Sequence, residues 1–176
     1  PKYFNYEKKI NPINEYLINQ YDLELNNYSD IKFKIFPLPH LMIKNANLEI
    51  VNKSININSS NINIFLNLNN FYDYKNFKAK KILINQSEIL LELTRFKELT
   101  DYVDSLKNKL EIKNLKLNLK KDIKNLINII KISFSNYGYK KFEITGEIFK
   151  KKFLVSIKDK NKKINFKLLN TGIKAD

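Results

Sequence analysis

The sequence predicts an α+β domain that is mostly β: a curved, antiparallel, meander-like sheet with an apolar concave face. Apolar residues recur at every second position over most of the chain, which is the period of a half-buried strand. The stretches between these runs are of hairpin length, which favours antiparallel neighbours. Only two segments show helical spacing instead, a short one from Pro12 to about Gln20 and a longer one near 96–109.

The 176 residues suit a single domain, and a 43% hydrophobic content is enough for a packed core. We treat 1–176 as one β-rich domain and as a fragment of a longer chain, with an N-terminal membrane anchor before Pro1 and a continuation after Asp176. The sequence has no cysteine, so no disulfide framework is available. No window reaches about 18 uninterrupted apolar residues, so no transmembrane helix is expected within these bounds.

The first helix begins with Asn11 as the N-cap and Pro12 at the first helical position. Its apolar face recurs at helical spacing and consists of Ile13, Leu17 and Tyr21. A short strand at Leu23–Leu25 follows, and alternating apolar residues over 31–35 predict the next strand. Pro37 and Pro39 then fix a bend, because each locks φ and removes a backbone donor.

One pattern occurs three times after this bend: apolar alternation, a polar break, then apolar alternation. It covers 41–50, 82–91 and 112–119. In the first copy the alternation changes phase at Asn45–Asn47, which indicates a bulge or a tight turn. We interpret Pro37, Pro39 and Asn45 as architectural residues that turn the chain into the sheet.

The remaining strands follow the same period. The cleanest alternation runs over 62–68, and further strands are predicted at 126–134, 142–149, 153–157 and 164–168. Between them, the helix near 96–109 carries an apolar stripe for packing on the sheet, formed by Phe96, Leu99, Val103, Leu106 and Leu110.

Catalytic constellations are missing from the sequence, and we expect a protein that is not an enzyme and has no metal or cofactor. His40 is the only histidine, and its place beside Pro39 favours a solvated loop residue over a metal ligand or a catalytic base. Glu88 and Glu92 are expected to be solvated partners of neighbouring lysines. The three glycines are isolated and cannot build a phosphate-binding loop.

The net charge of +14 raises the possibility of a nucleic-acid or membrane partner. Lysines are spread through almost every segment, however, and the apolar faces consist of Ile and Leu, which do not stack on bases. Nucleic-acid binding is therefore unlikely and is kept as the weaker alternative.

The aliphatic faces exceed what two helices can cover, and an antiparallel sheet does not leave its apolar face in water. One solution is a curled sheet whose apolar groove holds acyl chains; the other is a closed core in a structural or assembly-adaptor domain without lipid cargo. The groove hypothesis assigns the lining to Ile62, Ile64, Leu66, Leu68, Ile82, Ile84, Ile89, Leu91, Leu93, Phe153, Val155, Ile157, Ile164, Phe166 and Leu168. It predicts that Ile64→Asp or Leu91→Asp impairs lipid loading.

The order of these segments resembles the N-terminal region of the AsmA-like family, the AsmA and TamB group of bacterial envelope proteins. The resemblance rests on a strand ending in Phe36-Pro37-x-Pro39, then Leu41-x-Ile43-x-Asn45 and Leu48-x-Ile50, then the strands at 62–68 and 82–93. It implies an anchor in the inner membrane, a location on its periplasmic side, and a long curled sheet that conducts phospholipid or limits outer-membrane assembly. Implied partners are phospholipid or another acyl-chain lipid, the membrane through the anchor, and outer-membrane assembly proteins.

Overall fold

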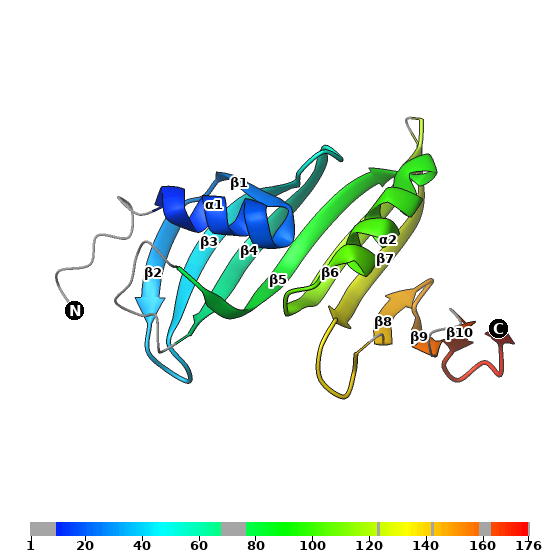
Figure 1. Ribbon diagram of the computed structural model, residues 1–176. Helices are drawn as coiled ribbons and strands as arrows, with labels where there is room; N and C mark the ends of the chain where they lie inside the picture. The colour runs from blue at the N-terminus through cyan, green and yellow to red at the C-terminus, as the bar shows by residue number, and fades with distance from the viewer. Residues whose placement is uncertain (1–9, 68–76, 123, 142, 159–162, 176) are drawn as a thin grey trace.

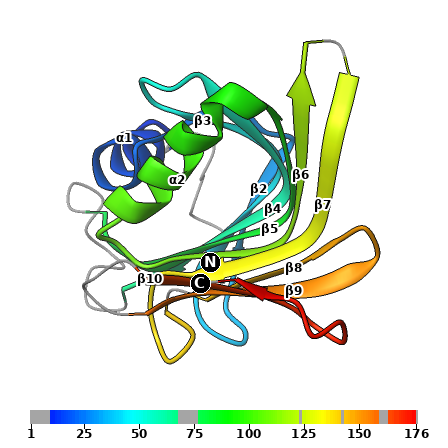
Figure 2. The ribbon, with the colours of Figure 1, turned by 90° about the vertical axis from the view of Figure 1, so that its right-hand side faces the viewer.

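The computed structural model describes residues 10–67, 77–122, 124–141, 143–158 and 163–175. It shows one curved sheet with two α-helices on its concave side (Figures 1 and 2). The helical segments are α1 (Ile10–Tyr21), a 3-10 turn (Leu93–Arg95) and α2 (Phe96–Ser105). The strands are β1 (Leu23–Asn27), β2 (Asp30–Lys34), β3 (His40–Ile50), β4 (Ile55–Leu66), β5 (Ala79–Glu92), β6 (Leu110–Lys121), β7 (Lys124–Ser135), β8 (Glu143–Ile148), β9 (Lys151–Lys158), β10 (Lys163–Leu168) and β11 (Lys174–Ala175).

The predicted fold class, a curved and mostly β sheet with two helices, is confirmed. The eleven described strands form one sheet in the order β1-β3-β4-β5-β6-β7-β8-β9-β10-β11, with β2 also paired to β3. The sheet departs from a meander at two places. Both β1 and β2 pair with β3, along different parts of it, and β5 and β6 run parallel. A parallel pair needs a crossover connection, and α2 supplies it by carrying the chain back across the concave face.

The second helix is shorter than the sequence indicates, since it ends at Ser105 rather than near Lys109. Leu106 is already extended, with φ −64° and ψ 115°. The side chain of Asn136 then holds the connecting segment, donating to the carbonyls of Leu106 and Asn108. The segment after the helix is therefore held by a residue 30 positions beyond Leu106 in the chain.

The polar breaks of the repeated pattern form a line of bends across the sheet. Asn45 in β3, Gln86 in β5, Asn114 in β6 and Lys131 in β7 all have positive φ, between 46° and 54°. Asn45 and Ser60 lie opposite each other without being paired, although the residues on either side of them are paired in one continuous register. The same holds for the β4–β5 and β5–β6 pairs, which skip Gln86 and Asn114. Neighbouring strands thus bend at the same level.

These bends explain the phase change in the sequence. A skipped residue shifts the alternation of side chains by one, so that apolar residues on both halves of a strand face the same side of the sheet. In β3 this brings Leu41 and Ile43 onto the face of Leu48 and Ile50, and all four are buried. The predicted bulge or turn is a bend inside a continuous strand, and the sheet curves around the helices in Figure 2.

The core lies between the two helices and the concave face of β1 to β7. The helix α1 contributes Ile13, Leu17 and Tyr21, as its spacing predicts, and each is at most 3% exposed. From α2 the buried residue is Tyr102, whose hydroxyl donates a hydrogen bond of 2.8 Å to the carbonyl of Tyr21. Three residues of the predicted stripe, Leu99, Val103 and Leu106, are partly buried against the core. The other two differ from the prediction, because Phe96 is 38% exposed and Leu110 is a buried residue of β6.

Two serines that face each other at the bend make a matched pair for a stability measurement. Ser59 donates to the carbonyls of Asn61 and Asn85, whereas the buried hydroxyl of Ser87 has no partner among the described residues. We expect Ser59→Ala to lower the free energy of unfolding by about 1 kcal/mol, and Ser87→Ala to leave it equal or higher. Urea unfolding of the two variants checks this. Equal losses in both would show that the hydroxyl of Ser87 is bonded in solution.

Candidate functional site

One row of apolar side chains crosses the sheet from β3 to β10. Directly paired residues lie on the same face of a sheet, so cross-strand partners can be followed from strand to strand. On this basis the row is continuous from the N-terminal strands to the C-terminal ones. Its members, in strand order, are Ile43, Ile62, Ile84, Ile112, Phe134, Ile144, Val155 and Phe166. We call this side of the sheet the apolar face.

The N-terminal part of the predicted lipid lining is on this face but is covered. Six of its residues are at most 2% exposed within the core: Ile62, Ile64, Ile82, Ile84, Ile89 and Leu91. Leu66 is partly buried, and Leu93 belongs to the 3-10 turn with 40% of its surface exposed. Leu68 lies outside the described residues. In this arrangement a ligand could reach the six buried residues only if a helix moved.

The C-terminal part of the lining is more open. Figure 1 shows α1 in front of the first strands and α2 in front of β6 and β7, and in Figures 1 and 2 no described helix covers β8, β9 or β10. Val155, Phe166 and Leu168 are only half-buried there. The remaining two residues of this set, Ile157 and Ile164, are paired with each other across β9 and β10. Exposure of the apolar face thus rises toward the C-terminal strands.

Phe153 is the buried exception on these strands, and a glycine makes room for it. A Cβ atom at Gly146 would lie 2.6 Å from Cζ of Phe153, so the phenyl ring occupies the space of a side chain there. The ring also stacks on Phe166, with 6.0 Å between the centroids. In the sequence, Gly146 suggests a kink in the strand. In the structure, it leaves room for the ring of Phe153 on the apolar face.

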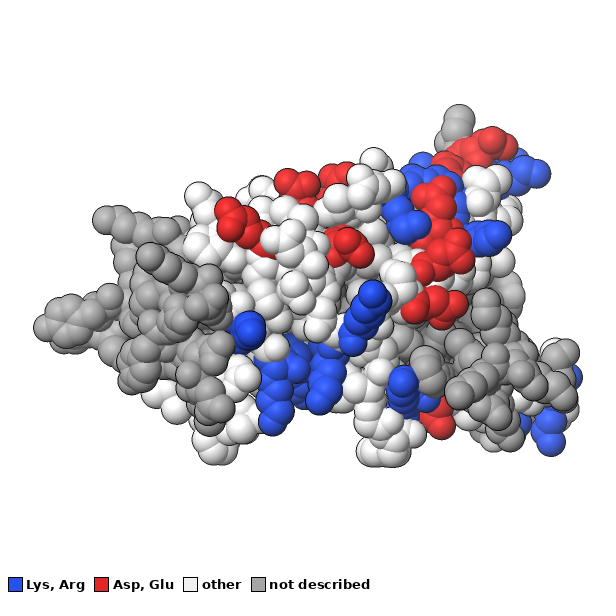
Figure 3. Space-filling view, viewed as in Figure 1, with Lys and Arg blue, Asp and Glu red and all other residues white. Residues whose placement is uncertain are grey.

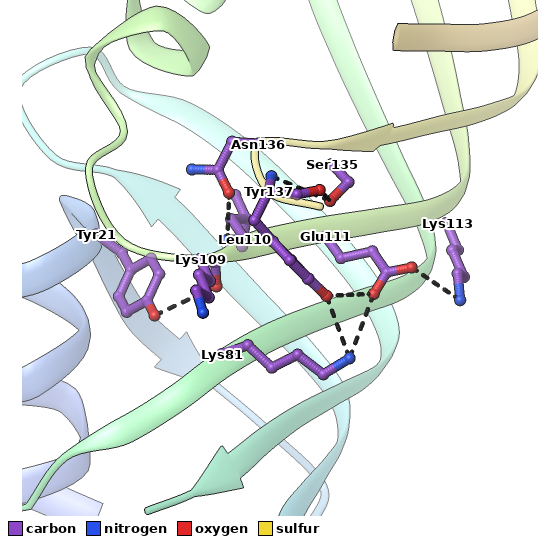
Figure 4. Close-up of polar contacts among 9 residues, drawn as sticks. All are labelled: Tyr21, Lys81, Lys109, Leu110, Glu111, Lys113, Ser135, Asn136 and Tyr137. Carbon is purple, nitrogen blue, oxygen red and sulfur yellow. Dashed lines mark hydrogen bonds and ion pairs between the residues drawn. The ribbon is translucent and has the colours of Figure 1, made fainter. Parts of the chain in front are cut away.

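The convex side carries a polar cluster at the parallel junction, formed by Lys81, Glu111, Lys113 and Tyr137 (Figure 4). Glu111 Oε2 accepts a hydrogen bond of 2.7 Å from the hydroxyl of Tyr137, and Oε1 lies 2.9 Å from Nζ of Lys113. Lys81 donates to the hydroxyl of Tyr137 at 3.1 Å, and its Nζ lies 4.7 Å from the ring centroid of Phe65.

The electrostatics of this cluster favour its charged carboxylate. Burial acts to raise the pKa of Glu111, but hydrogen bonds from Lys113 and Tyr137 outweigh it and hold that pKa below its ordinary value. Burial and the bond to Glu111 raise the pKa of the Tyr137 hydroxyl. Both carboxylate oxygens are occupied, so the cluster offers no free base. It ties β5, β6 and the end of β7 together.

Within the described part of the chain, no group of three or more His, Asp or Glu residues could hold a metal ion. Glu88 and Glu92 pair with Lys116 and Lys120 on the neighbouring strand, at 3.0 and 3.1 Å. The expectation of a solvated His40 is wrong: the residue is buried, and its Nδ1 donates to the carbonyl of Leu38 at 2.7 Å.

Sequence reasoning missed Tyr102 and Asn136. Tyr102 has a signal, since it follows Leu99 by three residues and precedes Leu106 by four, which is also helical spacing. Asn136 looks like a turn residue beside Gly138, and only the fold brings it to Leu110, whose backbone N–H donates to its Oδ1 at 2.8 Å. Neither residue has a signal for contact with a ligand.

No protein-family model matches this sequence, and no curated protein matches it. The resemblance to AsmA-like proteins therefore stays a prediction that rests on the residues named for it. The structure also contains no described helix long and apolar enough to cross a membrane.

Proposed function

We propose that this chain is a non-enzymatic envelope-biogenesis domain that carries or channels phospholipid along the apolar face of its sheet. Following the family resemblance, it belongs to a protein anchored in the bacterial inner membrane and located on the periplasmic side. In this proposal the protein carries phospholipid or regulates outer-membrane assembly. The observation that supports the proposal most is the apolar row that continues beyond the helices onto β9 and β10.

The half-buried part of the apolar face on β9 and β10, at Val155, Phe166 and Leu168, is the place where acyl chains would lie. Each CH₂ group kept from water is worth about 0.8 kcal/mol. An acyl chain that moves from a bilayer to an aliphatic wall therefore changes its free energy little, and the transfer needs no catalyst. The cargo would be held by contact area, which suits a face of Ile, Val and Phe without a fixed polar partner.

Two neighbouring residues of β9 give a matched test of this face. Val155 faces the apolar side, opposite Phe166, and Leu154 faces the other side, opposite Lys167. Both are half-buried. We expect Val155→Asp to lower the phospholipid retained by the purified protein at least severalfold, because a carboxylate interrupts the apolar row, and Leu154→Asp to retain the wild-type amount.

Native mass spectrometry of protein purified from bacterial cells measures this, with circular dichroism to confirm that both variants fold. Equal lipid in wild type and folded Val155→Asp would contradict the proposal, as would a wild-type protein that binds no phospholipid when mixed with vesicles.

The second candidate is a structural or assembly-adaptor domain with a closed core. The near-complete burial of Ile62, Ile64, Ile82 and Ile84 beneath α1 and α2 favours it for the N-terminal half. The same lipid measurement separates the two candidates, since an adaptor carries no phospholipid in any variant.

A further inference from the structure

The bend between β2 and β3 presents large apolar side chains to water. Ile35 is 70% exposed, Phe36 87% and Leu38 49%. The base of the bend is held in place, because Leu66 donates its backbone N–H to the carbonyl of Pro39 and His40 bonds to the carbonyl of Leu38. Single exposed apolar residues are common on soluble proteins, but a contiguous apolar tip marks an interaction site.

A second exposed aromatic lies at the same end of the sheet. The register places the start of β3, the start of β5 and the end of β7 at one end: His40 pairs with Phe65, Ile82 with Leu110, and Glu111 with Ser135. The loop after β7 carries Tyr139, which is 92% exposed. In both Figure 1 and Figure 2 this loop and the β2–β3 bend project beyond the sheet on the same side. We call this side the loop end.

Exposed lysines lie at the same end of the sheet as these apolar tips. They come from the bend, from the segment before β5, from the connection before β6 and from the loop after β7: Lys34, Lys78, Lys80, Lys109, Lys140 and Lys141. Two carboxylates lie at this end: Glu111 is paired with Lys113 and Lys81, and the half-buried Glu143 begins β8 just after Lys140 and Lys141. In Figure 3 lysines lie on the lower part of the visible face with an acidic residue beside them, whereas acidic residues lie over both helices and are mixed with basic residues around α2.

We propose that the loop end docks on an anionic phospholipid bilayer, with the Ile35–Leu38 tip inserted among the lipids and Tyr139 at the interface. Aromatic and aliphatic side chains enter the headgroup and upper acyl region, while lysines bind the negatively charged surface. A protruding tip suits a deformable bilayer better than a protein partner, which would need a matching pocket. The exposed lysines of the loop end match an anionic surface in charge. This docking does not depend on lipid cargo and stands or fails separately from it.

Binding to vesicles tests the insertion, with Phe149 as the matched control. Phe149 is 78% exposed beside Lys150 and Lys151, and the register places its turn, between β8 and β9, at the opposite end of the sheet. Vesicles of equal parts phosphatidylcholine and phosphatidylglycerol are used for co-sedimentation, and pure phosphatidylcholine vesicles form the neutral arm. Phe36→Ser is expected to weaken binding to the anionic vesicles about tenfold, and Phe149→Ser to leave it unchanged.

A tryptophan reporter gives a readout independent of affinity, because the chain contains no tryptophan. The emission of Phe36→Trp should shift to the blue when anionic vesicles are added, and brominated lipid should quench it; Phe149→Trp should show neither change. Three results would overturn the proposal: Phe36→Ser binding as tightly as wild type, an unshifted reporter at position 36, or a shift that follows protein concentration without vesicles. The last outcome would assign the tip to a second copy of this chain.

Discussion

Ile64→Asp is expected to unfold the domain. The side chain of Ile64 is fully buried, paired with Leu41 and Ile82 on the neighbouring strands. A buried carboxylate without a partner costs several kcal/mol, and the lost aliphatic packing costs about 2–5 kcal/mol more. The sum is comparable with the whole stability of an ordinary domain, about 5–15 kcal/mol. Far-ultraviolet circular dichroism and a thermal scan should show no cooperative transition at neutral pH.

The matched control for this variant is Asn58→Asp in the same strand. Asn58 is exposed on the convex side, and its side-chain oxygen accepts a hydrogen bond from Asn47, which a carboxylate can also accept. The new carboxylate would lie opposite Glu88, which is paired with Lys116, so we expect a loss of no more than about 1 kcal/mol. A folded Ile64→Asp protein would show that the helices separate from the sheet easily. In that case Ile64 and its neighbours could be reached by lipid.

Tyr102→Ala is expected to release α2 from the sheet and to lower the free energy of unfolding by about 3–5 kcal/mol, as for other large-to-small core substitutions. Tyr102 is the buried anchor of this helix, and it joins α2 to the end of α1 through its hydrogen bond to Tyr21. Burial raises the pKa of its hydroxyl, so the group remains a neutral donor.

Tyr102→Phe separates the two contributions, because it keeps the ring and removes only the donor. Its expected cost is about 1–2 kcal/mol, since the carbonyl of Tyr21 is left without this donor in a buried place. Urea unfolding of both variants provides the comparison. If Tyr102→Ala unfolds at the same urea concentration as wild type, the helix is not held by this residue.

The strands could be predicted from the sequence because their period is a local property. The repeated break at Asn45, Gln86 and Asn114 was visible as a phase change, and each break is a residue of positive φ in the structure. The parallel pairing of β5 and β6 could not be predicted from the sequence. The direction of β6 depends on the path that the chain takes through α2. Local spacing assigned the packing stripe of α2 to Leu99, Val103 and Leu106, and only the position of α1 shows that Tyr102 is the buried anchor.

The candidate site divides in the same way. The sequence by itself determined that Ile62, Ile84, Val155 and Phe166 share one apolar face, since alternation and the phase changes dictate which side of a strand a residue takes. Only the tertiary structure decided which of them are accessible. The core beside the two helices extends from β1 to β7, whereas β9 and β10 are half-open. Helix placement is a long-range outcome of packing that no single strand encodes.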